Sequence, residues 1–310
     1  MNINIVFIGA VFLLASCENP NKRPEYLDSP KQGTIHISVD ESFRPVIDEQ
    51  IKMYEASYPE AKIIAHYKPE ADCLKDLFRD SANRMVIVTR GLTEKEQNFF
   101  RDSLQYVPAW NVMALDAVVL LVNAKSNDTL FTLKRLQDQL QGKINRQQEI
   151  VFDGLNATST VRFVMDSLLK GAKFDTTVVR AAPNSEGVID YVATHPNAIG
   201  LVGINWIGNP EDSAQLRNLQ RVKMAYVQCT ICPDTPYVKP MQQSIETKRY
   251  PLVRGLFYIV KENYTLGLGT GFMSFLKYER GQLIFRRAYL VPVMQFGVRN
   301  IKINEKIPEN

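Results

Sequence analysis

Thr34-Ile-His-Ile-Ser-Val39 leads through Asp40-Glu41-Ser42 into Pro45-Val-Ile-Asp-Glu-Gln-Ile-Lys-Met-Tyr54, and this stretch decides the fold. Apolar and polar residues alternate over 34–39, which predicts a β-strand. The next three residues are of the types that cap helices, and apolar residues then recur every three or four positions. The stretch therefore predicts a strand, a loop and a helix, in that order.

The same unit recurs along the chain. Further strands are expected at 61–66, 85–89, 112–122, 149–152, 198–202 and 255–260, and helices at 70–78, 93–100, 130–140, 161–170, 187–194 and 271–279. Such alternation predicts an α/β fold with a parallel sheet. The chain has 310 residues, which is enough for about two domains.

Composition excludes several classes of protein. Hydrophobic residues make up 45% and charged residues 23%, as in ordinary globular proteins, so disorder and coiled coil are not expected. Lys and Arg number 37 and Asp and Glu 33, which leaves a net charge of +4 with no run of basic residues. We therefore expect no nucleic-acid partner.

The amino-terminal residues indicate the location of the protein. Residues 5–15 are apolar, too short a stretch to cross a bilayer core of about 30 Å but typical of the apolar region of a signal peptide. Leu14-Ala15-Ser16-Cys17 resembles a bacterial lipobox, which implies a signal peptide over 1–17 and a lipid on Cys17, although no Lys or Arg precedes the apolar stretch. An uncleaved apolar terminus is the alternative. The polar, proline-containing residues 18–33 are interpreted as a tether.

Three further cysteines have to be assigned a role. Cys229-Thr-Ile-Cys232 has the spacing of a redox motif, but the prolines of Pro233-Asp-Thr-Pro236 block the helix that such a motif opens. A local disulfide or two inert thiols is the favoured interpretation. A zinc site lacks ligands, because no histidine lies near the cysteines at ligand spacing; the three are His36, His66 and His195. We expect no metal and no cofactor.

Two features carry the candidate chemistry. Asp116 interrupts the apolar residues 112–122, where a carboxylate is costly unless it has a partner. Asn156-Ala-Thr-Ser-Thr-Val-Arg162 places hydroxyl and amide groups where a helix starts, and free N–H groups with the positive end of the helix dipole favour an anion there. Alternatives remain for both: Asp116 as a carboxylate that caps a neighbouring helix, and the turn as a capped helix without a ligand.

The order of these motifs resembles that of the PstS-like phosphate-binding proteins of ABC importers, over nearly all of residues 34–300. The resemblance is carried by 34–43, 86–96, 114–123, 133–144, 187–202 and 250–259. It implies the two-lobed, type II periplasmic-binding-protein fold, in which each lobe is a mainly parallel sheet flanked by helices and the chain crosses between the lobes twice. The lobes would comprise 34–124 with 241–305, and 125–240.

The resemblance also implies the ligand-binding residues. These would be Ser42, Phe43, Thr89, Asp116, Thr158, Ser159 and Thr160. The family usually has an Arg ahead of its Ser-Gly-Thr turn, but this chain has Phe152 and Asp153 there. Arg90 or Arg162 could replace it, and Arg162 is equally interpreted as a solvated helix residue.

These residues imply a function. A solute-binding lipoprotein would capture hydrogen phosphate between the lobes and deliver it to ABC permease subunits, as a monomer on the periplasmic side of the envelope. Asp116 would accept the proton of hydrogen phosphate and thereby disfavour sulfate. No enzymatic activity is expected, because no motif supplies a nucleophile with a base. The alternatives are a surface or scaffold lipoprotein of the same fold, or binding of another oxyanion.

Overall fold

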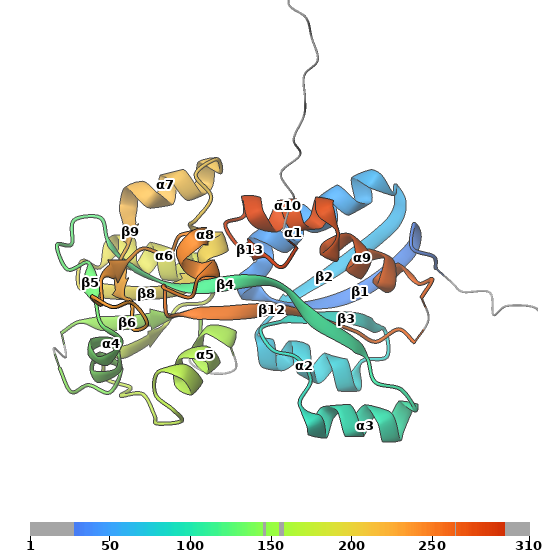
Figure 1. Ribbon diagram of the computed structural model, residues 1–310, viewed down its shortest axis with the longest axis horizontal. Helices are drawn as coiled ribbons and strands as arrows, with labels where there is room; N and C mark the ends of the chain where they lie inside the picture. Colours follow the sequence, from blue (N-terminus) through green and yellow to red (C-terminus); the bar gives the residue numbers. More distant parts are fainter. Residues whose placement is uncertain (1–27, 145–146, 155–157, 264, 295–310) are drawn as a thin grey trace, which may run out of the picture.

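The fold is described from a computed structural model, which places residues 28–144, 147–154, 158–263 and 265–294 (Figure 1). The expected signal peptide with Cys17, and Asn156 and Ala157 of the hydroxyl-rich turn, lie outside the described residues. In the part of the chain that is described, no helix has the length and apolar character needed to cross a membrane.

The first strand-loop-helix unit forms where the sequence predicts it. Asp40 accepts a hydrogen bond from the Ser42 N–H at the end of the first strand, and Pro45 occupies the first turn of the following helix, where a missing N–H costs nothing. Thr93 and Glu96 form a reciprocal capping box at a later helix start. This part comprises β1 (Gln32–Asp40), η1 (Glu41–Phe43), α1 (Arg44–Ser57), β2 (Glu60–Lys68), α2 (Glu70–Arg79), β3 (Asn83–Val88) and α3 (Glu94–Leu104).

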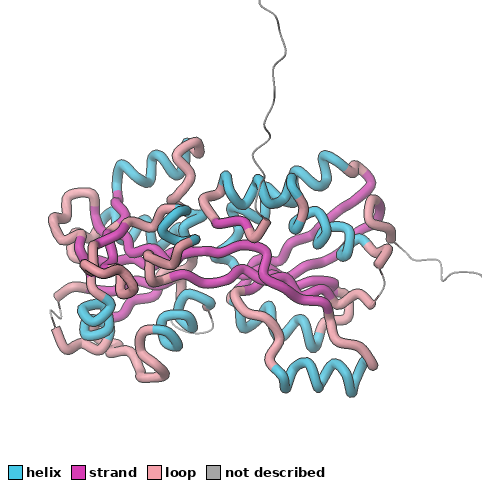
Figure 2. Tube along the Cα trace, viewed as in Figure 1, coloured by secondary structure: helices cyan, strands magenta, loops and turns pink. Residues whose placement is uncertain are grey.

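Two long strands connect the two halves of the molecule (Figure 2). Strand β4 (Ala109–Asn123) pairs over 109–117 with β12 (Val253–Val260), antiparallel. Over 118–123, β4 pairs instead with β8 (Ala198–Gly203) and β9 (Val222–Met224), also antiparallel. One strand thus belongs to both halves of the sheet, as its unbroken apolar sequence allows.

The middle of the chain builds the second half. Its parallel strands β6, β7 and β8 lie side by side, and α5 and α6 flank them (Figure 1). The other elements are β5 (Leu130–Phe131), α4 (Leu133–Leu140), β6 (Glu149–Phe152), α5 (Ser159–Ser167), β7 (Val179–Ala181), α6 (Ser185–Thr194), η2 (Ile204–Trp206), α7 (Ser213–Arg221), β10 (Tyr226–Gln228), β11 (Tyr237–Val238) and α8 (Gln242–Glu246).

The end of the chain returns to the first half through β12 and then forms α9 (Leu268–Lys277), α10 (Glu279–Arg287) and β13 (Val291–Pro292). The strand order is β2-β1-β3-β12-β4-β8-β6-β7. The outer pairs are parallel, as predicted, whereas β12 and β4 run antiparallel to their neighbours because they carry the chain between the halves. One apolar core extends through both halves.

Two expectations are refined at the ends of segments. The sequence predicts that the tether extends to residue 33, but Asp28 is buried, pairs with Arg84 and accepts the N–H of Leu268, so residues 28–33 are part of the fold. The helix expected from Leu130 starts at Leu133, because Leu130 and Phe131 pair with β10.

Of the two interpretations of the cysteine pair, the structure selects the local disulfide. Cys229 and Cys232 are bonded, and Cys73 is buried and free. The next element after Cys232 is strand β11, not a helix, in agreement with the prolines after Cys232.

Candidate functional site

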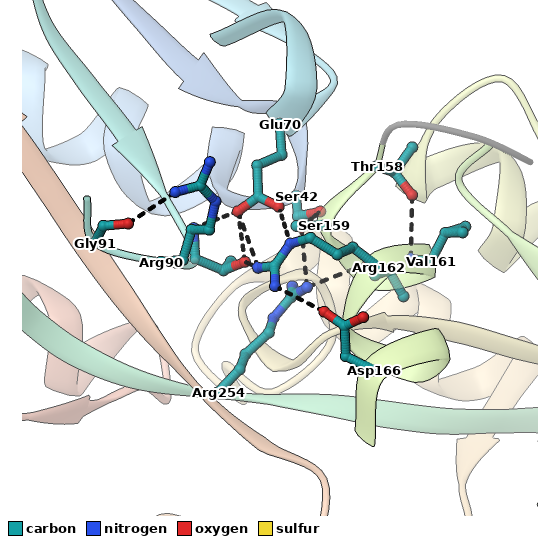
Figure 3. Close-up of polar contacts among 12 residues, drawn as sticks. Ser42, Glu70, Arg90, Gly91, Thr158, Ser159, Val161, Arg162, Asp166 and Arg254 are labelled. Atoms are coloured by element: carbon teal, nitrogen blue, oxygen red, sulfur yellow. Dashed lines mark hydrogen bonds and ion pairs between the residues drawn. The ribbon is translucent and has the colours of Figure 1, made fainter. Parts of the chain in front are cut away.

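Arg254 of β12 occupies the centre of a buried polar cluster between the two halves (Figure 3). Its side chain is 2% exposed, and Nε donates to the Asp116 carboxylate on β4 at 2.7 Å. Nη1 donates to the Ser159 hydroxyl at 3.0 Å and to the Thr160 hydroxyl at 3.4 Å, both in the first turn of α5. The guanidinium carbon lies 5.2 Å from the centre of the Phe43 ring, a cation–π distance.

One nitrogen of this guanidinium is left over. Arg254 Nη2 is buried and has no hydrogen-bond partner among the described residues. A buried charged donor without an acceptor is costly, so the atom marks a position where an acceptor from a ligand or water would be stabilised. Gly203 keeps this position open, because a Cβ there would come within 3.4 Å of Nη2 and 3.3 Å of the Asp116 carboxylate.

Asp116 is fully buried and has a protein partner at each carboxylate oxygen. Oδ2 accepts from Arg254, and Oδ1 accepts the N–H of Ile204 at 3.2 Å, the first residue of η2. Burial raises the pKa of Asp116, and the charge of Arg254 opposes that rise. The capping alternative for Asp116 is therefore present together with a role not foreseen, that of orienting Arg254.

Asp153 and Ser42 join the start of α5 to the end of β1. Asp153 directly follows β6, and its Oδ2 accepts from the hydroxyls of Ser42 at 3.2 Å and Thr160 at 3.3 Å. The Ser42 and Ser159 hydroxyls are 3.3 Å apart. Burial raises the pKa of Asp153, and its Oδ1 is buried without a partner in the described part of the chain.

Asp40 is a second buried carboxylate at the end of a strand. It is the last residue of β1, just as Asp153 directly follows β6. Its Oδ1 accepts the Ser42 N–H at 3.1 Å, and its Oδ2 has no partner within the described ranges. Burial, followed by the negative charge of Glu70, raises the pKa of Asp40 to about 7. Ser42 therefore lies between two buried carboxylates, each with one open oxygen.

A second guanidinium crosses between the halves beside this cluster. Arg162 of α5 binds Glu70 of α2 through Nε at 2.6 Å and Nη2 at 3.3 Å. Glu70 also accepts the N–H and the hydroxyl of Thr89, each at 2.7 Å, and Arg162 Nη2 donates to the same hydroxyl at 2.7 Å. Burial by itself raises the pKa of Glu70, but its bonds to Arg162 and Thr89 outweigh this and lower the pKa. Glu70 and Arg162 are therefore both charged. Arg162 thus forms an ion pair with Glu70 across the two halves, while 35% of its side chain remains exposed.

Arg90 is engaged elsewhere. Its guanidinium forms a two-pronged ion pair with Glu96, with both distances 2.7 Å, and bonds the carbonyl of Gly91. In Figure 3 it lies apart from Arg254, at the loop before α3. The structure therefore gives no support to Arg90 as the missing guanidinium.

The structure brings most of the predicted residues into one cluster. Ser42, Phe43, Asp116, Ser159 and Thr160 surround Arg254; Thr89 and Arg162 lie beside it; and Thr158 caps α5 by accepting the Val161 N–H at 3.3 Å. The sequence reasoning missed Arg254, Asp40, Asp153 and Glu70. The signal for Arg254 is the same as that for Asp116, a lone charge in an apolar strand.

Within the described residues, no group of three potential ligands is placed to hold a metal ion.

Comparisons with known proteins show the family and the fold of the chain. The PBP superfamily domain matches residues 24–279. The phosphate-binding protein PstS of Borreliella burgdorferi is 20% identical over 295 residues, covering 90% of this chain and 94% of its own. A Clostridium perfringens protein whose crystal structure contains bound phosphate has a TM-score of 0.69 at 18% identity, with 84% and 100% of the two chains covered. An ABC-type phosphate transport receptor from Vibrio cholerae has a TM-score of 0.60 at 17% identity, with 83% and 99% covered. The predicted two-lobed α/β fold class is confirmed.

Proposed function

The chain belongs to the PBP superfamily, and from this premise we propose that it is a solute-binding protein that captures inorganic phosphate around Arg254 and delivers it to an ABC importer. The relative from Borreliella burgdorferi is a phosphate-binding protein, and the solved structure from Clostridium perfringens contains phosphate. These similarities support the substrate, and the cluster described above supports a site for it in this chain.

The observation that carries the proposal is the unpartnered Nη2 of Arg254. An oxyanion at this atom would also meet the Ser159 and Thr160 hydroxyls and the amino-terminal end of α5, where the helix dipole favours negative charge. Arg254 would thus take the place of the Arg that the family usually has where this chain has Phe152 and Asp153, and it comes from a different strand.

The proposed ligand would engage both halves of the molecule at once. Ser42 precedes α1 in the first half, whereas Ser159 and Thr160 start α5 in the second. We propose that these halves are the two lobes, 34–124 with 241–305 and 125–240, and that the anion favours their closed arrangement. Arg254 and Ser159 would donate to it, and the Ser42 and Thr160 hydroxyls would do so on turning away from Asp153, with Phe43 against the guanidinium. Asp116 would orient Arg254, and Thr89, Thr158 and Arg162 would support the surrounding loops.

The location of the protein is part of the proposal. The apolar residues 5–15 and the lipobox ending at Cys17 support an extracytoplasmic lipoprotein, anchored through Cys17 and acting as a monomer. Its partners would be the permease subunits of the importer.

A second function is favoured by one specific observation. The Glu70 carboxylate already accepts hydrogen bonds from Arg162 and Thr89. The Arg162 guanidinium therefore has an anionic partner within the protein itself. A scaffold lipoprotein of this fold, without transport, would have no need of a ligand.

Titration calorimetry with phosphate, sulfate and molybdate separates the two functions. We expect a saturable signal with phosphate that is weaker or missing with sulfate. The absence of heat with all three anions at millimolar concentration, on protein shown to be folded, would favour the scaffold.

A further inference from the structure

An aromatic groove lies between the end of α1 and helix α9, outside the cluster around Arg254. This entry groove has a volume of about 390 Å³, and its aromatic lining consists of Tyr54, Tyr58, Phe275 and Tyr278. Tyr54 packs edge-on against Tyr58 and Phe275, with ring centres 5.0 and 5.3 Å away. Tyr278, between α9 and α10, is 66% exposed. An exposed group of aromatic rings indicates an interaction surface.

The rim of the entry groove is basic. Lys31 lies just before β1, with its Nζ 5.7 Å from the centre of the Tyr58 ring, and Arg280 lines the groove from the first turn of α10. Among the described residues that line it, Glu279 is the one carboxylate. Tyrosine rings together with exposed cations are typical of protein surfaces that lie at the interface between a bilayer and water.

The described chain begins at the edge of this groove, and buried bonds fix it there. Asp28 is 7% exposed, pairs with Arg84 at 3.0 Å and accepts the N–H of Leu268 at 3.0 Å. Pro30 lines the groove, and its carbonyl accepts from the Tyr54 hydroxyl. The start of β1 lies at the end of the first half that is away from the second half (Figure 1). A tether attached at Asp28 therefore holds the entry groove toward its anchor.

The length of that tether limits how far the groove can be from a membrane. Ten residues, 18–27, separate Asp28 from Cys17, the residue that would carry the lipid. A fully extended chain rises at most about 3.6 Å per residue, so Asp28 stays within about 40 Å of Cys17. At such a distance the effective concentration of the membrane surface is high, and contacts that are weak on their own hold the groove against it.

We propose that the entry groove rests on an anionic phospholipid surface and thereby orients the protein on the membrane. Lys31 and Arg280 bind headgroup phosphates. Tyr58 and Tyr278 lie in the interfacial layer, which suits a ring with an apolar body and a polar hydroxyl. This inference rests on the proposed lipid at Cys17, and it goes beyond it by naming the face of the protein that the membrane contacts.

Tyrosine footprinting of the whole lipoprotein tests this face. The purified protein is inserted through its own lipid into vesicles of phosphatidylethanolamine with about one-quarter phosphatidylglycerol, and nitration by tetranitromethane is followed by mass spectrometry. Tyr237 of β11 is the internal control, because it is 39% exposed and lies in the second half. The chain from residue 18, free in solution, gives the reference rates and contains all of the described fold.

The expected result is selective protection. The rate at Tyr278, relative to that at Tyr237, should fall about fivefold or more on the vesicles, since each cation near an anionic surface contributes about a fivefold preference for it. Protection should be weaker on vesicles of phosphatidylcholine alone. Equal protection of the two tyrosines, or none, would overturn the inference, and equal protection of Tyr278 on both kinds of vesicle would overturn the role of anionic headgroups.

A double variant assigns the contact to the two cations. Lys31→Glu with Arg280→Glu should remove the selective protection of Tyr278, because both side chains then repel the headgroups. Lys173→Glu with Arg217→Glu, at two exposed positions of the second half, is the matched control for net charge and should keep it. Protection that persists in the first variant, on folded protein, would contradict the proposed contact.

Failure of this inference can be distinguished from failure of the proposed function. A protein that does not float with the vesicles would refute the lipid on Cys17, and a protein that gives no heat with phosphate would refute phosphate capture. The Lys31→Glu, Arg280→Glu variant should bind phosphate normally, because neither residue bonds the Arg254 cluster. Protection of Tyr278 that requires added permease subunits would show that the groove faces a protein, and would overturn the inference.

Discussion

Arg254 and Asp116 are direct partners across the antiparallel strands β12 and β4, and their side chains meet at 2.7 Å in the buried interior. Two charges that each look misplaced in an apolar strand thus neutralise one another. The pair leaves part of the guanidinium free, because only Nε is used by the carboxylate. A buried pair of this kind contributes little net stability but holds a donor in a fixed direction.

The first prediction concerns this guanidinium. Arg254→Lys keeps the charge but loses the planar fork, so it cannot bond Asp116, Ser159 and a ligand together. We expect phosphate affinity to fall by about tenfold or more in calorimetry, since a charge-assisted hydrogen bond is worth about 1.5–3 kcal/mol. Arg180→Lys, at an exposed ion pair with Glu149, is the control and should bind normally. Normal binding by Arg254→Lys would remove Arg254 from the site.

The second prediction is a pH dependence of stability. The pKa of Asp40 is about 7 in the fold, above that of the unfolded chain, so the folded state holds the extra proton. The contribution of Asp40 to stability is therefore lost as pH rises from about 4 to about 7, and it is constant above. Asp40→Asn should gain stability relative to the natural protein over that window, by up to a few kcal/mol. Urea unfolding of both proteins at several pH values, without phosphate, measures this; a difference that does not grow with pH contradicts it.

The third prediction concerns the closed arrangement. Glu70 and Arg162 come from α2 and α5 on opposite halves, whereas Glu96 and Arg90 lie on one half. Removing the first pair with Glu70→Gln should let the halves separate, because the amide binds Arg162 more weakly than the carboxylate does. Small-angle X-ray scattering should show a larger radius of gyration for this variant without ligand. Glu96→Gln is the matched control and should scatter like the natural protein; identical scattering of all three would rule out a closing role.

The fourth prediction concerns the disulfide. Cys229 and Cys232 enclose a very short loop between β10 and β11, so the bond restricts the unfolded chain only slightly. Replacing both by Ala should cost about 2 kcal/mol or less in chemical unfolding. Phosphate affinity should not change, since no bond of the Arg254 cluster comes from this loop. A large loss of affinity would show that the loop reaches the site.

The fifth prediction concerns the anchor. Cys17→Ser should abolish lipid attachment and release the protein from membranes, because the lipobox Cys is the residue that would carry the lipid. Metabolic labelling with a fatty acid, together with fractionation, measures both effects. Labelled Cys17→Ser protein in the membrane fraction would refute lipidation at this residue.

The strands and helices that the sequence predicted are those whose local pattern and burial agree. The alternation over 34–39 and the apolar residues 112–122 mark β1 and β4, because each strand packs as its own sequence dictates. Short elements such as β7 and η2, and the polar helices α7 and α10, escaped prediction. Their apolar residues are few, and long-range packing and sheet pairing complete them.

The candidate site was predicted only as far as one chain segment could reveal it. The hydroxyls of Ser159 and Thr160 are visible in a single turn, but Arg254 joins them from almost a hundred residues away, through pairing of β12 with β4. Two lone charges in two apolar strands could have been matched to each other in advance. The open oxygens of Asp40 and Asp153 depend on burial by other elements, which no local pattern reports.

The strand order also has a consequence for biosynthesis. Strand β3 pairs on one edge with β1 and on the other with β12, which the ribosome makes about 165 residues later at a rate of roughly 5–20 residues per second. During that interval the apolar edges of β3 and of the first part of β4 have no partner in the nascent chain. An exposed strand edge is a template for aggregation, so the newly made chain depends on being shielded until about its last fifth emerges. The strand that supplies Arg254 is therefore also the one whose arrival ends the vulnerable period.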